Sequence, residues 1–187
     1  MRPLLVLSLF TASALMACVN QDPAPLFLQT SYQVRCLDCT PVTTDNLART
    51  VAALDGESGF SVACSAQRSG KDRLLSFSGT LIDPKHESNN YSLKIIQANL
   101  DKSDPGAGCR VVITEGANTY ESHCTGGDPT PDEPCQITKL KAANGIVTGK
   151  LLCNNIPNRT DANTTRYVVK PSTTSPADFE VDGCVGL

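Results

Sequence analysis

Residues 109–124 read CRVVITEGANTYESHC, and this stretch decides the fold. Two candidate strands flank the turn-forming residues Glu115-Gly116-Ala117-Asn118. An antiparallel hairpin centred on that turn places Cys109 directly opposite Cys124, close to the Cα separation of about 5.5 Å that a disulfide needs. The stretch therefore predicts a hairpin closed by a Cys109–Cys124 bridge.

A second hairpin of the same plan follows in residues 135–153, CQITKLKAANGIVTGKLLC. Asn144-Gly145 is a strong signal for a hairpin turn, and a turn there brings Cys135 opposite Cys153. We predict a Cys135–Cys153 bridge on this geometry. A Cys124–Cys135 pairing is an alternative that the residues leave open.

Short candidate strands separated by turn-rich gaps make up most of the remaining chain. Phe60–Cys64 and Leu75–Leu81 alternate apolar with small polar residues, as half-buried strands do. Gaps rich in Pro, Gly and Asp divide the strands, notably at 101–108 and 126–134. The pattern predicts a single all-β domain, a disulfide-stapled antiparallel β-sandwich or partly open barrel. Further candidate strands are 91–96, 136–140, 147–153, 166–170 and 179–184.

Residues 45–54 fit two different elements. Leu47, Val51 and Leu54 follow the spacing of a helix that buries one face. Read as a strand, the same segment leads through the turn-forming residues 55–59 into the next strand as a hairpin. We favour the hairpin.

Nine cysteines are a heavy count for 187 residues. They would indicate metal or redox chemistry in a reducing compartment and disulfides in an exported protein. The N-terminus favours export, because Met1-Arg2-Pro3 precedes an apolar run that has the anatomy of a signal peptide. The run is shorter than the roughly 20 residues that span a bilayer.

Leu15-Met16-Ala17-Cys18, at the end of that run, resembles the lipobox of bacterial lipoproteins. The resemblance implies removal of residues 1–17 as a signal peptide and lipidation of the Cys18 sulfur, which would anchor the protein in a lipid bilayer. Met16 departs from the family pattern, in which Ala, Ser or Thr is commoner. Residue 19 is Val and not Asp. By resemblance to enterobacterial sorting, this indicates the outer membrane of the cell envelope.

Cleavage after Ala12-Ser13-Ala14, an ordinary signal-peptidase site, is the competing interpretation. It would release a protein with an odd number of cysteines, and an unpaired exposed thiol is a liability in an oxidising compartment. Lipid on Cys18 leaves eight cysteines, an even number that can pair completely, so cysteine parity agrees with the lipobox. Spacing assigns no partners within the remaining set, Cys36, Cys39, Cys64 and Cys184.

Cys36 and Cys39 are expected to reach different partners and so to staple the N-terminal strand to the body of the domain. Residues 18–30 contain two prolines and many polar residues, which predicts a lipidated flexible tether. The Cys-rich β domain is then expected to occupy residues 31–187.

Composition and motifs exclude several functions. A net charge of −3 provides no basic footprint, so nucleic acid is a poor partner. The Cys36-Leu37-Asp38-Cys39 spacing suits a redox motif, but no βαβ setting surrounds it, so structural bridges are the better interpretation. His86 and His123 lie far apart in sequence and indicate neither zinc nor a Ser-His-Asp triad. Residues 126–134 gather three carboxylates that could bind calcium but lack EF-hand spacing.

We therefore predict no catalytic residue, no metal and no cofactor. The rhythm of Cys109-x-Val-x-Ile and Gly149-x-Leu-x-Cys is similar to that of uncharacterised cysteine-rich β lipoproteins of myxobacteria and their relatives, a resemblance that carries no activity. The expected function is a non-enzymatic binding or structural module of the cell envelope with an unidentified envelope protein as partner, bound for example by an exposed edge strand. The alternatives are a secreted inhibitor or small-ligand-binding β domain and, less favoured, an envelope hydrolase.

Overall fold

The computed structural model describes residues 25–36, 47–102, 107–160, 166–171, 173 and 175–187. These residues form strands and turns with two short 3₁₀ helices, and none of the helices among them has the length and apolarity to cross a membrane. The strands build two antiparallel sheets, so the expected all-β fold is confirmed. The strands are β1 (Phe27–Cys36), β2 (Leu47–Leu54), β3 (Phe60–Ser69), β4 (Asp72–Leu81), β5 (Tyr91–Asn99), β6 (Arg110–Glu115), β7 (Asn118–His123), β8 (Cys135–Ala143), β9 (Ile146–Pro157), β10 (Arg166–Pro171) and β11 (Phe179–Asp182).

One sheet, which we call the meander sheet, contains β3 to β7, each paired antiparallel with the next. Its registers align buried residues from all five strands in single rows, because side chains of a strand alternate between its two faces. One such row contains Val62, Gly79, Leu93, Ile113 and Tyr120, all of them buried. The apolar half of each strand thus forms one continuous inner face.

The other sheet, which we call the split sheet, contains the remaining six strands. β2 and β8 form its two edges, and β1 and β9 lie next to them. The position between β1 and β9 is shared by two short strands, because β11 pairs with the first half of β1 and β10 with the second half. The sheet is therefore assembled from the two ends of the domain.

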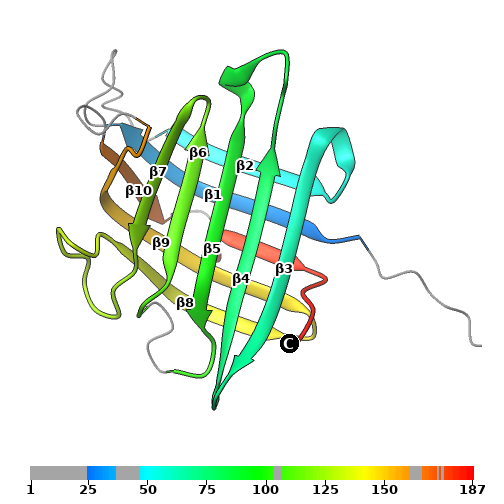
Figure 1. Cartoon of the computed structure of the whole chain (residues 1–187), viewed down its shortest axis with the longest axis vertical. Coiled ribbons are helices and arrows are strands. Elements are labelled where there is room, and N and C mark those ends of the chain that lie inside the picture. Colours follow the sequence, from blue (N-terminus) through cyan, green and yellow to red (C-terminus); the bar gives the residue numbers. More distant parts are fainter. Residues whose placement is uncertain (1–24, 37–46, 103–106, 161–165, 172, 174) are drawn as a thin grey trace, which may run out of the picture.

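The two sheets pack face to face with their strands crossing, as Figure 1 shows with β3 to β7 in front of β1, β8 and β9. Phe77 of the meander sheet packs against Phe179 of the split sheet, with ring centroids 4.9 Å apart. Gly79 lies against Leu28, and Gly149 lies against the ring of Phe179, so closely that a Cβ atom at either glycine would overlap these side chains. Glycine at these positions is required by close packing.

Three disulfides connect strands among the residues that the structure describes. Cys109–Cys124 closes the β6–β7 hairpin and Cys135–Cys153 closes the β8–β9 hairpin, the two pairings that hairpin geometry predicts. The third bridge, Cys64–Cys184, joins β3 of the meander sheet to the segment that follows β11 of the split sheet. Cys124 and Cys135 are neighbours in a short parallel bridge but are bonded to other partners.

The Cys64–Cys184 bridge corrects one expectation. Cys36 and Cys39 were expected to reach different partners on the body of the domain. The six cysteines of the body are instead bonded in three pairs among themselves, Cys64–Cys184, Cys109–Cys124 and Cys135–Cys153. Neither Cys36 nor Cys39 can therefore be joined to any of them. Cys39 and the side chain of Cys36 lie outside the described residues, as do Cys18 and the predicted signal peptide.

One boundary and one strand pairing differ from the sequence-based expectation. Strand β1 begins at Phe27, so the last four residues of the predicted tether, 27–30, belong to the sheet. Residues 47–54 are a strand, as favoured over a helix, but β2 pairs with β1 and belongs to the split sheet. The turn at 55–59 therefore carries the chain from one sheet to the other instead of closing a hairpin within one sheet.

Candidate functional site

The loop 82–90 holds one of the two histidines. His86 Nδ1 lies 3.2 Å from Asp83 Oδ2, and the Asp83 carboxylate also accepts hydrogen bonds from the Asn89 side chain and from the backbone N–H groups of Lys85 and His86. These hydrogen bonds, that of Asn89 foremost, lower the pKa of Asp83. Within the described chain no serine hydroxyl is hydrogen-bonded to His86, so this arrangement shapes a loop and does not activate a nucleophile.

His123 lies at the end of β7 opposite Arg110, as the hairpin predicts, and is exposed. Arg110 in turn donates to the Glu121 carboxylate at 3.3 Å. Among the residues that the structure describes, no three His, Cys, Asp or Glu side chains gather as they would around a metal ion, and this includes the carboxylates of the loop 126–134. That loop is closed on itself by paired bonds between Thr130 and Glu133.

Buried polar groups lie inside the domain and bond to the fold. The Tyr91 hydroxyl lies 3.2 Å from Thr30 Oγ1 and 3.0 Å from the Tyr32 hydroxyl, which ties β5 to β1 across the interior. Asp178 is fully buried where β10 gives way to β11, and its carboxylate accepts the Leu151 N–H at 2.8 Å. These groups are satisfied within the protein, as buried polar groups generally are.

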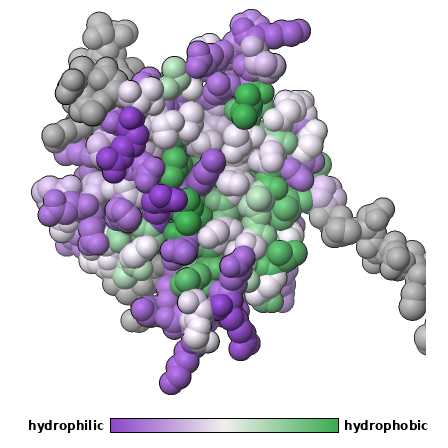
Figure 2. Space-filling model, viewed as in Figure 1, coloured by the Kyte–Doolittle hydropathy of each residue, from purple (hydrophilic) through white to green (hydrophobic). Residues whose placement is uncertain are grey.

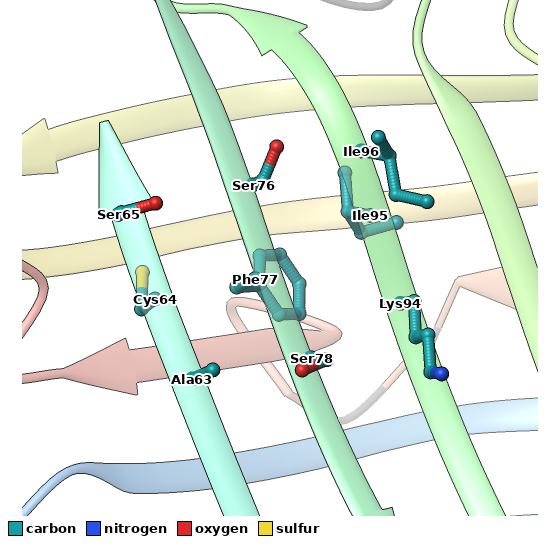
Figure 3. Close-up of a pocket in the computed structure, with 9 residues that line it drawn as sticks. All are labelled: Ala63, Cys64, Ser65, Ser76, Phe77, Ser78, Lys94, Ile95 and Ile96. Carbon is teal, nitrogen blue, oxygen red and sulfur yellow. The ribbon is translucent and has the colours of Figure 1, made fainter. Parts of the chain in front are cut away.

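The outer face of the meander sheet carries an open hollow of about 330 Å³. Figure 3 shows Ser65, Ser76 and Ser78 on β3 and β4, with Lys94 and Ile96 on β5 beside them. The Lys94 ammonium points away from the serine hydroxyls, and no hydrogen bond joins it to them in the described chain. The hollow therefore offers hydroxyl groups for binding but lacks a base placed to activate them.

Small hydroxyl side chains extend across the same sheet. A row of Ser61, Thr80, Ser92, Thr114 and Thr119 crosses all five strands, and the last two hydroxyls lie 3.3 Å apart. Sequence analysis did not single out these residues. The sequence shows them only as the Ser and Thr residues that alternate with apolar residues along each strand. The strand register is needed to show that they line up in rows across the sheet.

The edges of the meander sheet are covered. At β3, the Ala66 N–H donates to the Val185 carbonyl at 2.9 Å, so the C-terminal segment pairs with the strand. At β7, the Thr119 carbonyl accepts the Arg159 N–H at 2.7 Å, and the segment after β9 lies against this edge. Additional strands cannot add at these places without displacing their covers.

The edges of the split sheet differ from one another. At β8, the Thr125 N–H donates to the Cys135 carbonyl, a bulge interrupts the register between Thr138 and Lys141, and Lys139 adopts a positive φ of 53°. Bulges and exposed lysines are the usual protection of an edge strand. β2 pairs with β1 in an unbroken register over all eight residues, and no other strand of the described chain pairs with it.

Hydrogen-bond alternation shows which groups of β2 point outward. The Asp55 N–H donates to the Leu26 carbonyl, so the odd-numbered residues bond to β1 and the even-numbered ones direct their N–H groups away from it. The Leu54 N–H accordingly bonds to the Glu57 carboxylate. Thr50 and Ala52 direct theirs to the open edge, where residues 50–54 carry no charge and no proline.

Comparison with protein-family models, with curated proteins and with solved structures finds no match for this chain. The candidate sites therefore rest on their own geometry. Of the cysteines singled out in the sequence, Cys64, Cys109, Cys124, Cys135, Cys153 and Cys184 form three bridges, whereas the expected lipidation site Cys18 lies outside the described residues.

Proposed function

We propose that the protein is a non-enzymatic binding module of the bacterial cell envelope, anchored through lipid on Cys18 and displayed at the outer membrane. Three disulfides support export, because such bridges persist in oxidising compartments. Six of the nine cysteines are paired in these bridges, and the parity argument for lipid on Cys18 concerns the remaining three, Cys18, Cys36 and Cys39. The lipobox-like segment 15–18 remains the basis for the anchor.

The observation that carries the binding role is the edge of β2, with which no strand other than β1 pairs in the described part of the chain. The backbone N–H groups of Thr50 and Ala52 point outward from a regular strand whose residues 50–54 carry no charge, while the other three edges are covered or blunted in the described chain. An extended segment of a partner can pair with such an edge through main-chain hydrogen bonds. The module accordingly binds an envelope protein by adding that protein's strand to the split sheet.

A small-ligand-binding role is the second candidate, and the hollow beside Ser65, Ser76 and Ser78 favours it. The hollow is open to solvent, whereas most small-ligand sites enclose the greater part of their ligand. Hydrolysis has less support, because neither histidine pairs with a serine in the described chain. The edge of β2 is therefore the better-supported site.

Anchoring is tested by the intact mass of the full-length protein after expression in a bacterium and extraction from its membranes. The expected mass lacks residues 1–17 and includes acyl chains, and the wild type pellets with membranes. The Cys18→Ser variant serves as control and should be neither acylated nor membrane-bound. Wild-type protein that retains residues 1–17, or whose Cys18 is unmodified, would contradict the anchor.

Strand addition is tested by replacing Ala52 with proline. Ala52→Pro removes an outward N–H without removing a bond to β1, and proline is tolerated at such edge positions. Loss of about one main-chain hydrogen bond, together with the clash of the proline ring, should weaken capture of the partner from solubilised envelope membranes by about tenfold or more.

Ala52→Lys and Ala63→Lys form a matched pair for the same capture experiment. Both alanines are exposed on edge strands, but the C-terminal segment covers the edge of β3 nearby, at Ser65 and Ala66. Ala52→Lys should weaken capture, and Ala63→Lys should leave it unchanged. Recovery of the same partner in equal amounts by wild type and Ala52→Pro, or recovery of no partner by the wild type, would refute the proposal.

A further inference from the structure

Four large apolar side chains are exposed in the described chain, and we call this set the apolar collar. Its members, Leu54, Ile82, Ile146 and Val185, have exposed fractions between 38% and 64%. They come from four separate segments of sequence. Scattered apolar side chains are ordinary on protein surfaces, so their grouping in space is what requires an explanation.

The collar surrounds the point at which the chain enters the domain, at Leu26 and Phe27. Leu54 is the register partner of Phe27, and Asp55 bonds to the Leu26 carbonyl. The segment that leads to Val185 contacts Leu26 at Gly183.

The other two members adjoin the same place. Ile146 lies at the start of β9, where Gly145 accepts a hydrogen bond from Cys184. Ile82 lies against Gly59 of the turn that follows β2. Figure 2 shows hydrophobic residues in the centre and on the right of this face, the side on which β1 begins in Figure 1, whereas hydrophilic residues dominate the left.

The length of chain between Cys18 and the collar limits where the domain can lie. Seven residue steps separate Cys18 from Pro25, and a fully extended chain of that length spans at most about 25 Å. A lipid on Cys18 therefore keeps the domain close to the membrane. Because the chain emerges through the collar, the collar is the part of the domain nearest to the bilayer.

We propose that the apolar collar rests on the lipid surface and inserts its side chains between the headgroups, so that the domain is docked on the membrane and does not hang freely from its anchor. This inference rests on the proposed lipidation of Cys18. The occupant is an electroneutral lipid surface, because the charged side chains beside Leu54 and Phe27 are acidic. They are Asp55, Glu57 and Asp182, all exposed. Anionic lipid would repel them.

The test uses tryptophan as a unique reporter, since the chain contains none. Leu54→Trp and Ile146→Trp place the indole in the collar, and Asp132→Trp places it on the exposed loop 126–134 as the control. β9 starts at the collar and runs about 36 Å to Pro157, which lies beside that loop. Figure 1 shows the loop on the side of the domain opposite the start of β1.

The acylated full-length variants are reconstituted into phosphatidylcholine vesicles, with and without bromine on the acyl chains. The collar tryptophans should fluoresce at a shorter wavelength in vesicles than in the unfolded protein without lipid or detergent. Brominated lipid should quench their fluorescence severalfold more than that of the tryptophan introduced at position 132. Replacing part of the phosphatidylcholine by phosphatidylglycerol should reduce that quenching.

Three results would overturn the inference. Equal quenching at the collar and at position 132 would show a domain without a preferred orientation. A blue shift without quenching that grows with protein concentration would assign the collar to a second copy of the chain. Quenching that increases with phosphatidylglycerol would contradict the electroneutral surface. Intact mass separates these failures from failure of the anchor itself, because it reports acylation of Cys18 independently.

Discussion

The two edges of the split sheet, β2 and β8, treat their exposed backbone in opposite ways. β8 carries a bulge, the exposed Lys139 and Lys141, and a cover over Cys135. β2 keeps an unbroken register with β1, and its residues 50–54, which include the outward N–H groups of Thr50 and Ala52, carry no charge, although Arg49 precedes them in the strand. Both strands belong to the same sheet and have similar lengths, so position alone does not explain the difference.

The contrast indicates that the residues in and around each edge strand determine whether that edge is protected. An unprotected edge is a site at which another chain can pair, and natural sheets usually prevent this. Protection on three edges makes the bare fourth edge informative, because the sequence can evidently supply lysines, bulges and covering segments. The experiments below change one edge while leaving the others as references.

The largest effect is expected from removing the bridge that holds the cover of β3. A Cys64→Ala, Cys184→Ala variant should lose about 2–5 kcal/mol of unfolding free energy, because the bridge links residues 120 positions apart. The same variant releases the Val185 segment from β3 and should therefore self-associate through a second bare edge. Urea unfolding and light scattering measure the two outcomes.

A Cys109→Ala, Cys124→Ala variant provides the control for that experiment. Its bridge spans 15 positions, so the chain-entropy argument gives a loss about 2 kcal/mol smaller. It uncovers no part of β3 and should remain monomeric. Equal scattering from both double variants would show that loss of stability, and not exposure of an edge, causes association.

A smaller effect is expected from making β8 resemble β2. The Lys139→Asn, Lys141→Thr variant removes two exposed charges but keeps a residue that tolerates positive φ at position 139. Stability should change by no more than about 0.5 kcal/mol, as for most surface substitutions. Sedimentation should detect weak self-association that the wild type lacks. A monomeric variant would show that the bulge alone protects this edge.

The smallest effect concerns charge away from both edges and sets the baseline for the comparison. Arg73 donates to the Asp101 carboxylate at 2.8 Å, and its hydrogen bonds lower the pKa of Asp101. A carboxylate with a lowered folded pKa contributes stability that is present above its unfolded value of about 3.9 and is lost as pH falls through the folded pKa. The Arg73–Asp101 pair should therefore contribute its stability fully above about pH 4 and lose it as the pH falls further.

Urea unfolding at successive pH values checks this baseline against the Asp101→Asn variant. Below about pH 4 the wild type should lose stability more steeply than the variant, which lacks the titrating group. Parallel curves would show that the Arg73 pair contributes nothing that depends on acid.

Local cysteine pairs were predictable because their partners are brought together by a single turn. Turn chemistry at Gly116 and at Asn144 sets each register, and the register sets which cysteines face one another. Cys64–Cys184 was not predictable in this way, since no turn relates the two residues. The expectation that Cys36 and Cys39 would reach the body was wrong for the same reason, because Cys64 and Cys184, the expected partners, are bonded to each other.

Residues 47–54 illustrate a second limit. Their apolar spacing suits either a helix or a strand, and the strand forms because β1 supplies an eight-residue partner. An exposed edge strand was expected as a way to bind a partner, but the sequence did not show that residues 47–54 form that strand. Which strand becomes an edge depends on where every other strand pairs.

The sequence by itself determined the all-β class, the places of most strands, the Cys109–Cys124 and Cys135–Cys153 bridges and the expectation of a lipidated Cys18. Period-two alternation and turn residues act over a few positions, so they can be read without the fold. Only the tertiary structure decided the Cys64–Cys184 bridge, the strand position shared by β10 and β11, the bare edge of β2 and the apolar collar. Each of these brings together residues from distant parts of the chain, and such contacts form only where the packing of two whole sheets places them.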